Sequence, residues 1–231
     1  MKGYLLLHGF AGSPEDLAPI AQHIKNDGGL LRCPALTLQG NRKLRVKSGD
    51  WEDWVASAES SLIQLQDVCS QIHVIGFSMG SLISVYLVTR FKVDRLVLMS
   101  PPMTANPQEF VKGMAQSLKD QLKRASSSTS TPYLKELIRR ASRFQLGYLT
   151  QFHELIDEVE PLLEKVTVPT LILHGEKDDF AHPNGARHIY QQLGSSEKKL
   201  VYLPKSRHLL CKDQEVDQVI KEVEDFLGLH S

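Results

Sequence analysis

The chain alternates short apolar runs with longer segments in which apolar residues recur at helical spacing. The runs are rich in Val, Ile and Leu and are typical of buried strands. They cover Gly3–Leu7, Leu30–Leu36, Ile72–Phe77, Val93–Ser100, Val168–His174 and Lys199–Leu203. Amphipathic segments follow most of them, as in the stretch with Leu17, Ile20 and Ile24. Strands that alternate with helices predict a mostly parallel sheet with helices on both faces.

The alternation stops between residues 101 and 166. From Met103 to about Val166 only helical patterns occur, and the small hydroxyl residues of Ser126–Thr131 interrupt them. We read Ser126–Thr131 as a connection between helices. The pattern therefore predicts one α/β core, formed by residues 1–100 and 167–231, with a helical insertion at 101–166.

Composition narrows the class of protein. The 231 residues are 42% hydrophobic and carry a formal charge of zero, which fits one compact domain. Balanced charge indicates no nucleic-acid partner. The longest apolar runs, such as Tyr4–Leu7 and Leu96–Met99, are too short to span a bilayer. Met1-Lys2 leads directly into the first predicted strand with no signal-peptide pattern, so we expect a cytoplasmic protein.

The three cysteines indicate neither a metal site nor a disulfide framework. Cys33, Cys69 and Cys211 have unrelated spacings, and we expect them to be buried, reduced thiols. Nothing in the sequence calls for a metal or a cofactor.

The clearest chemical signal is Gly76-Phe77-Ser78-Met79-Gly80, a G-x-S-x-G motif between a predicted strand and a predicted helix. In this context the motif predicts a nucleophile elbow. The turn places the serine in strained backbone, and side chains two residues to either side would collide as the chain reverses. Gly76 and Gly80 avoid that collision, so Ser78 is the candidate nucleophile.

A serine nucleophile needs a base, and the base needs a carboxylate. His208 follows the last predicted strand, where the base lies in the chain order that accompanies this elbow. The loop after the preceding strand offers Asp178 and Asp179. Spacing from the strand favours Asp178, and Asp179 stays the main alternative.

Backbone N–H groups near the elbow are candidate oxyanion donors. Met79 follows the nucleophile, and Phe10 lies in the glycine-rich loop after the first strand. His8 in the same loop is better suited to bracing the loop than to carrying protons. Carboxyl ends of parallel strands share one edge of the sheet, and Ser100 and His174 also fall at that edge.

These residues resemble the α/β-hydrolase family, and within it the small bacterial carboxylesterases and monoacylglycerol lipases. The motifs that carry the resemblance are His8-Gly9-Phe10, Gly76–Gly80, His174–Asp178 and the segment from Ser206 to Glu215. The resemblance implies a catalytic triad of Ser78, Asp178 and His208, with oxyanion donors at Phe10 and Met79. It also implies that residues 101–166 form a helical cap over an acyl pocket.

The predicted function is that of a cofactor-free serine hydrolase acting on carboxylic esters with an apolar acyl group. A thioesterase, an amidase or a carbon–carbon bond hydrolase could use the same triad, and a ligand-binding protein could keep the fold without turnover. Acyl-chain length, the alcohol portion and the oligomeric state stay open.

Overall fold

A six-stranded, all-parallel sheet forms the centre of the protein, in the order β2-β1-β3-β4-β5-β6. The computed structural model describes residues 1–10, 12–36, 50–103 and 147–229. The strands are β1 (Lys2–Leu7), β2 (Leu30–Arg32), β3 (Gln71–Phe77), β4 (Arg95–Met99), β5 (Thr170–Gly175) and β6 (Lys198–Leu203). The predicted parallel α/β architecture is confirmed.

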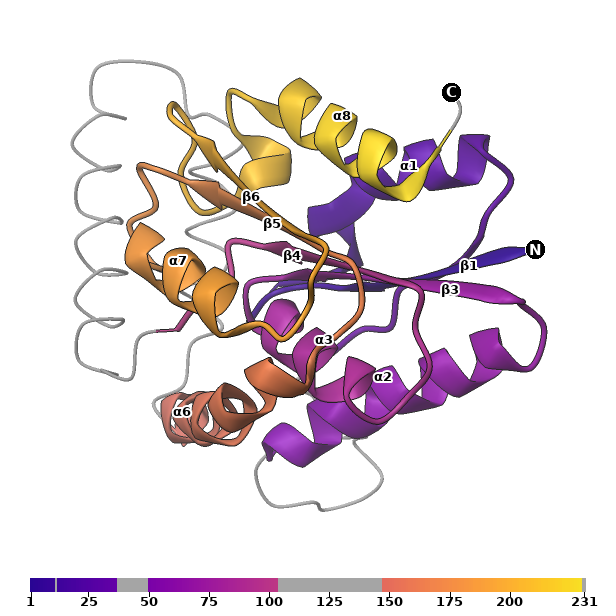
Figure 1. The fold of residues 1–231 in the computed structure, drawn as a ribbon, viewed down its shortest axis with the longest axis horizontal. Coiled ribbons are helices and arrows are strands. Elements are labelled where there is room, and N and C mark those ends of the chain that lie inside the picture. Colours follow the sequence, from indigo (N-terminus) through magenta and orange to yellow (C-terminus); the bar gives the residue numbers. More distant parts are fainter. Residues whose placement is uncertain (11, 37–49, 104–146, 230–231) are drawn as a thin grey trace.

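Helices cover both faces of this sheet (Figure 1). One face carries α1 (Ala18–Asn26) and α8 (Val216–Leu227). The other carries α2 (Trp51–Gln66), α3 (Met79–Val88), α6 (Gly147–Val159) and α7 (Pro183–Gln192). Short 3-10 helices lie at η1 (Pro14–Leu17), η2 (Glu160–Lys165) and η3 (Leu210–Lys212).

Alternate residues of the strands build two separate cores. Leu5 and Leu7 of β1 pack with residues of α2, α3 and α6, while Tyr4 and Leu6 pack with residues of α1 and α8. Side chains of a strand point to opposite faces in turn, so a strand buried on both faces is apolar throughout. This explains why the central strands appear in the sequence as continuous apolar runs.

β2 is shorter than the predicted strand Leu30–Leu36. Its pairing with β1 ends at Arg32. Pro34 has no N–H to donate to a ladder, and the N–H of Leu36 donates instead to the ring of His8. The apolar run therefore continues beyond the strand, where Leu36 is buried without pairing to β1 and Ala35 is exposed.

The insertion is described only in part. Residues 104–146 lie outside the described residues, so the proposed division into core and cap stays a prediction. Residues 147–165 form α6 and η2, and α6 packs beside α2 and α3.

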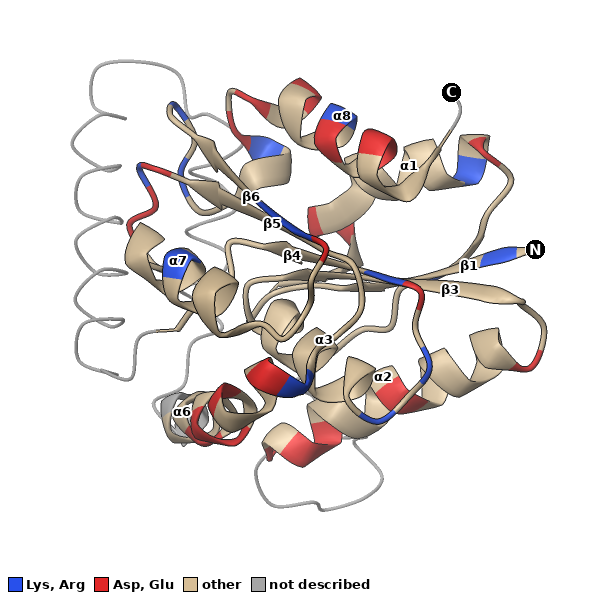
Figure 2. Cartoon of the chain, viewed as in Figure 1, with Lys and Arg blue, Asp and Glu red and all other residues tan. Residues whose placement is uncertain are grey.

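Charged residues lie mainly on the helices and loops, as Figure 2 shows, and the central strands carry few of them. Among the described residues, no helix is long and apolar enough to cross a membrane. None of the three cysteines is in a disulfide. Cys211 is buried, and the expectation of burial was wrong for Cys33 and Cys69, which are half-buried.

Candidate active site

Ser78 stands at the turn between β3 and α3, in a backbone conformation that few residues other than glycine adopt. Its φ is 53° and its ψ is −121°. The turn is fixed because the Ser78 N–H donates to the Met99 carbonyl at the end of β4, at 2.8 Å. Backbone strain of this kind costs about 1–3 kcal/mol and persists only where the surroundings enforce it.

The two glycines of the motif allow this turn to form. A Cβ on Gly76 would lie 2.4 Å from the Gly80 carbonyl oxygen. A Cβ on Gly80 would lie 2.1 Å from the carbonyl oxygen of Leu7 at the end of β1. Both contacts are with backbone, so neither position tolerates a side chain without a shift of the elbow.

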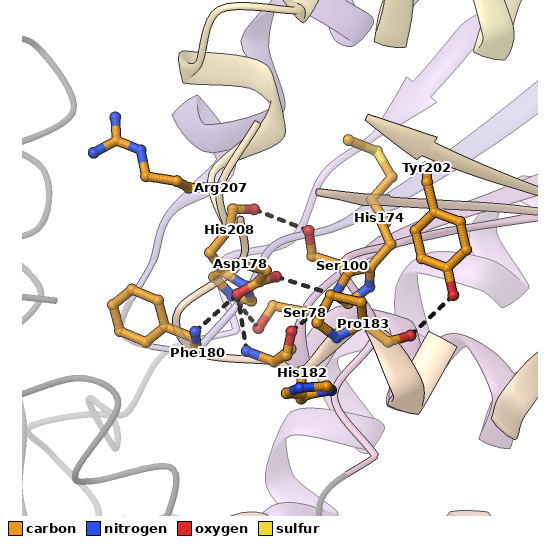
Figure 3. Close-up of polar contacts among 12 residues, drawn as sticks. Ser78, Ser100, His174, Asp178, Phe180, His182, Pro183, Tyr202, Arg207 and His208 are labelled. Carbon is orange, nitrogen blue, oxygen red and sulfur yellow. Dashed lines mark hydrogen bonds and ion pairs between the residues drawn. The ribbon is translucent and has the colours of Figure 1, made fainter. Parts of the chain in front are cut away.

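His208 lies beside Ser78, although 130 residues separate them in the chain (Figure 3). Its Nδ1 is 2.8 Å from Oδ2 of Asp178, and its Nε2 is 2.9 Å from Oγ of Ser78. An ionised carboxylate only accepts hydrogen bonds, so Nδ1 carries the proton. With a proton on Nδ1 alone, Nε2 can accept a hydrogen bond from the Ser78 hydroxyl.

Asp178 is held as an anion in the loop after β5. Its Oδ1 accepts the backbone N–H groups of Phe180 and Ala181, at 2.8 and 2.9 Å. Burial acts to raise the pKa of this carboxyl. The opposing effects of His208, of His174 and of the Ala181 N–H are larger together, and they hold its pKa below the ordinary 3.8.

The structure also separates the two aspartates that the sequence left as alternatives. Asp178 is buried and contacts His208, whereas Asp179 is exposed. Ser78, His208 and Asp178 are thus brought together, and their catalytic roles stay a prediction.

Two further contacts fix the position of the His208 loop. The Ser100 hydroxyl donates to the His208 carbonyl at 3.0 Å. The rings of Phe77 and Phe180 lie 5.2 and 5.1 Å from the His208 ring, centroid to centroid. Ser100 itself has a φ of 45°. Sequence reasoning placed Ser100 at the correct edge of the sheet but assigned it no contact, because no local pattern marks a strained serine.

The segment that carries Phe10 meets the elbow directly. A Cβ on Gly9 would lie 3.0 Å from the Cβ of Ser78, so the loop after β1 passes against the nucleophile. Met79 begins α3, and its N–H therefore has no acceptor within that helix. This placement suits Phe10 and Met79 as oxyanion donors, which stays a prediction.

His8 braces this loop from within. Its Nε2 accepts the N–H of Leu36 at 2.9 Å, and its Nδ1 donates to the Gly9 carbonyl at 2.9 Å. Both ring nitrogens are engaged by backbone, which agrees with a bracing histidine.

An aromatic group lies beside the same loop. The Phe10 ring is 6.1 Å from the ring of Trp54 on α2 and 6.1 Å from that of Phe152 on α6. The surroundings of the candidate oxyanion loop are therefore apolar. The described part of the chain contains no group of three His, Cys, Asp or Glu residues arranged to hold a metal.

Residues 4–215 match the family model described as "Serine aminopeptidase, S33". The chain is 27% identical to a thermostable monoacylglycerol lipase of Bacillus sp. (strain H-257), over 99% of this chain and 91% of the relative. It is 23% identical to a carboxylesterase of Bacillus subtilis (strain 168), over 98% and 92% of the two chains. The solved monoacylglycerol lipase of Paleococcus ferrophilus aligns with a TM-score of 0.76 and 15% identity, over 99% of this chain and 95% of that one.

Proposed function

The chain belongs to the serine aminopeptidase S33 family and is an α/β-hydrolase of the esterase and lipase type, and from this premise we propose that it cleaves carboxylic esters through an acyl-enzyme on Ser78. The α/β-hydrolase fold predicted from the sequence is confirmed. The observation that carries the proposal is the hydrogen-bonded series Ser78–His208–Asp178, with separations of 2.9 and 2.8 Å.

In the proposed mechanism, Ser78 Oγ attacks the ester carbonyl carbon while Nε2 of His208 takes the hydroxyl proton. Asp178 accepts from Nδ1 throughout and stabilises the imidazolium that forms. The C–O bond to the alcohol then breaks, and His208 returns the proton to the leaving alkoxide. Water, activated by His208 in the same way, cleaves the acyl-enzyme and regenerates Ser78.

The N–H groups of Phe10 and Met79 would stabilise the negative oxygen of each tetrahedral intermediate. One such donor contributes about 2.7–4 kcal/mol to the transition state. Support comes from the closeness of Gly9 to Ser78 and from the position of Met79 at the start of α3.

The proposed substrate is a small ester with an apolar acyl group, of the monoacylglycerol or simple carboxylic ester kind. The full-length relatives named as a monoacylglycerol lipase and a carboxylesterase support this class. The aromatic group of Phe10, Trp54 and Phe152 supports an apolar environment at the candidate oxyanion loop.

The direct test is hydrolysis of p-nitrophenyl esters from acetate to palmitate by wild type, Ser78→Ala and the matched control Ser61→Ala. Ser61 lies on α2, where its hydroxyl donates to the Ser57 carbonyl one turn back. We expect activity in wild type and Ser61→Ala, and its loss in Ser78→Ala. Equal activity of Ser78→Ala and wild type would contradict the proposal.

Peptide hydrolysis is the second function to test, because the family description names an aminopeptidase. Aminoacyl p-nitroanilides, assayed beside the esters, separate the two chemistries at the same nucleophile. Faster cleavage of the anilides than of every ester would replace the ester assignment with a peptidase and leave the role of Ser78 unchanged.

A further inference from the structure

His174 is a second histidine at the candidate active site, and the proposed proton transfer does not use it. It is the penultimate residue of β5, and its side chain is fully buried beside Asp178 (Figure 3). Its Nε2 lies 2.8 Å from the Ala181 carbonyl oxygen and 3.4 Å from Oδ2 of Asp178. Both of these oxygens are acceptors, so Nε2 carries a proton.

This N–H closes the turn that holds the aspartate. The Ala181 carbonyl accepts from His174, and the Ala181 N–H donates to Oδ1 of Asp178 at 2.9 Å. Ala181 is therefore tied on one side to the strand and on the other to the carboxylate. Since Oδ1 is occupied by backbone donors, Oδ2 is the oxygen that faces His208.

The neutral form of His174 is the one that fits this environment. Nδ1 is buried and has no hydrogen-bond partner among the described residues, so a proton there would lack an acceptor. Burial lowers the pKa of His174, and the nearby His208 and His182 act in the same direction. Asp178 and the Ala181 carbonyl oppose this effect without reversing it.

We infer that His174 is a positioning residue: as a neutral Nε2–H donor it holds the turn 178–181 so that Asp178 Oδ2 stays on Nδ1 of His208. This role rests on the proposed function, because it acts on the reaction only through Asp178 and His208. A histidine that merely fills space would instead be replaceable by any side chain of similar volume.

Two substitutions separate positioning from packing. His174→Leu removes the N–H donor and fills the site with an apolar side chain. His174→Gln keeps an N–H donor at comparable reach. His73→Leu is the matched control, because His73 is also buried in the sheet and neither of its ring nitrogens has a hydrogen-bond partner among the described residues. The control therefore removes a buried imidazole without removing a hydrogen bond.

We expect His174→Leu to lower kcat by between about 10- and 100-fold with little change in KM, since misplacement of a catalytic group by about 1 Å has effects of this size. A fall in kcat at nearly constant KM is the mark of a misplaced catalytic group, and simple loss of packing would not produce it. His174→Gln should restore most of kcat. His73→Leu should leave kcat and KM unchanged.

A measurement on the wild type needs no substitution. The ¹⁵N chemical shifts of His174 distinguish the two neutral tautomers and the imidazolium, and we expect the neutral Nε2–H form at pH 7. An Nδ1–H tautomer, or a charged ring at pH 7, would overturn the inference even if His174→Leu does not fold.

The rate of reaction with a fluorophosphonate distinguishes failure of the inference from failure of the proposed function. A reactive wild type and an equally reactive, folded His174→Leu would overturn the role of His174 alone. A wild type that neither hydrolyses esters nor reacts with the fluorophosphonate would overturn the proposed function, and this role with it.

Discussion

Gly80→Ala tests whether the close approach of the elbow to the end of β1 sets the geometry of the site. The added Cβ would lie 2.1 Å from the Leu7 carbonyl oxygen and 2.8 Å from that of His8. Ordinary contact begins near 3.4 Å, so the start of α3 and the end of β1 must separate by about 1.3 Å. Both contacted atoms belong to backbone, which leaves no side chain to rotate away.

That separation acts on the two candidate oxyanion segments in opposite directions. Met79 moves with α3, while Phe10 stays with β1, so the two N–H groups no longer converge on one oxygen. A displacement of about 1 Å predicts a loss in kcat/KM on the order of 10²-fold. The forced repacking should also lower the free energy of unfolding by about 1–3 kcal/mol.

The assay is kcat/KM for a p-nitrophenyl ester together with urea unfolding, for wild type, Gly80→Ala and the control Gly185→Ala. Gly185 lies in the first turn of α7, and its Cβ would come no closer than 3.3 Å to Met103. Alanine is favoured over glycine in a helix by about 0.5–1 kcal/mol, so the control should be neutral or slightly stabilised. A folded Gly80→Ala with kcat/KM within about threefold of wild type would show that this close approach does not set the geometry of the site.

Three further substitutions have defined outcomes. Asp178→Asn should lower kcat by up to roughly 10⁴-fold at constant fold, measured by ester turnover and circular dichroism, because an amide does not hold the Nδ1–H tautomer of His208. Burial lowers the pKa of His73 to about 4, so the free energy of unfolding is highest above pH 6.5 and falls as the pH drops from 6.5 towards 4. His73→Phe should remove roughly 3 kcal/mol of that pH dependence from the free energy of unfolding in urea. An unchanged dependence of this free energy on pH would contradict the prediction. Lys212→Met leaves the buried Asp16 carboxylate without the ammonium group 2.7 Å away. Urea unfolding should show a free energy of unfolding lower by about 2–3 kcal/mol. This loss is smaller than for a wholly buried pair because Lys212 is partly exposed.

The parts of the site that local sequence determines could be predicted. The elbow needs two glycines between a strand and a helix, and the sequence shows the glycines at Gly76 and Gly80 with the two patterns on either side. Ser78, Asp178 and His208 were identified as candidates because each follows the end of a predicted strand, in the chain order that accompanies this elbow. Their mutual contacts are long-range and depend on how β3, β5 and β6 lie in one sheet, which the alternating pattern only implied.

Other features have no local signal. The end of β2 was predicted too late because apolar residues continue past Pro34, and only the sheet shows that Leu36 donates to His8. The sequence placed His174 at the carboxyl edge of the sheet but assigned it no contact, since its contact with Ala181 depends on the shape of the intervening loop. The sequence also left Asp178 and Asp179 as alternatives, because two adjacent aspartates have the same chemistry. Only the folded loop shows that Asp178 is buried against His208 and that Asp179 is exposed.

Covalent labelling with a fluorophosphonate, followed by mass spectrometry of the labelled peptide, tests directly whether His208 activates Ser78. We expect one label per chain, on Ser78, and its loss in both Ser78→Ala and His208→Ala, with each variant folded. Full labelling of His208→Ala at the wild-type rate, or a label on another residue, would contradict the proposal that His208 activates Ser78.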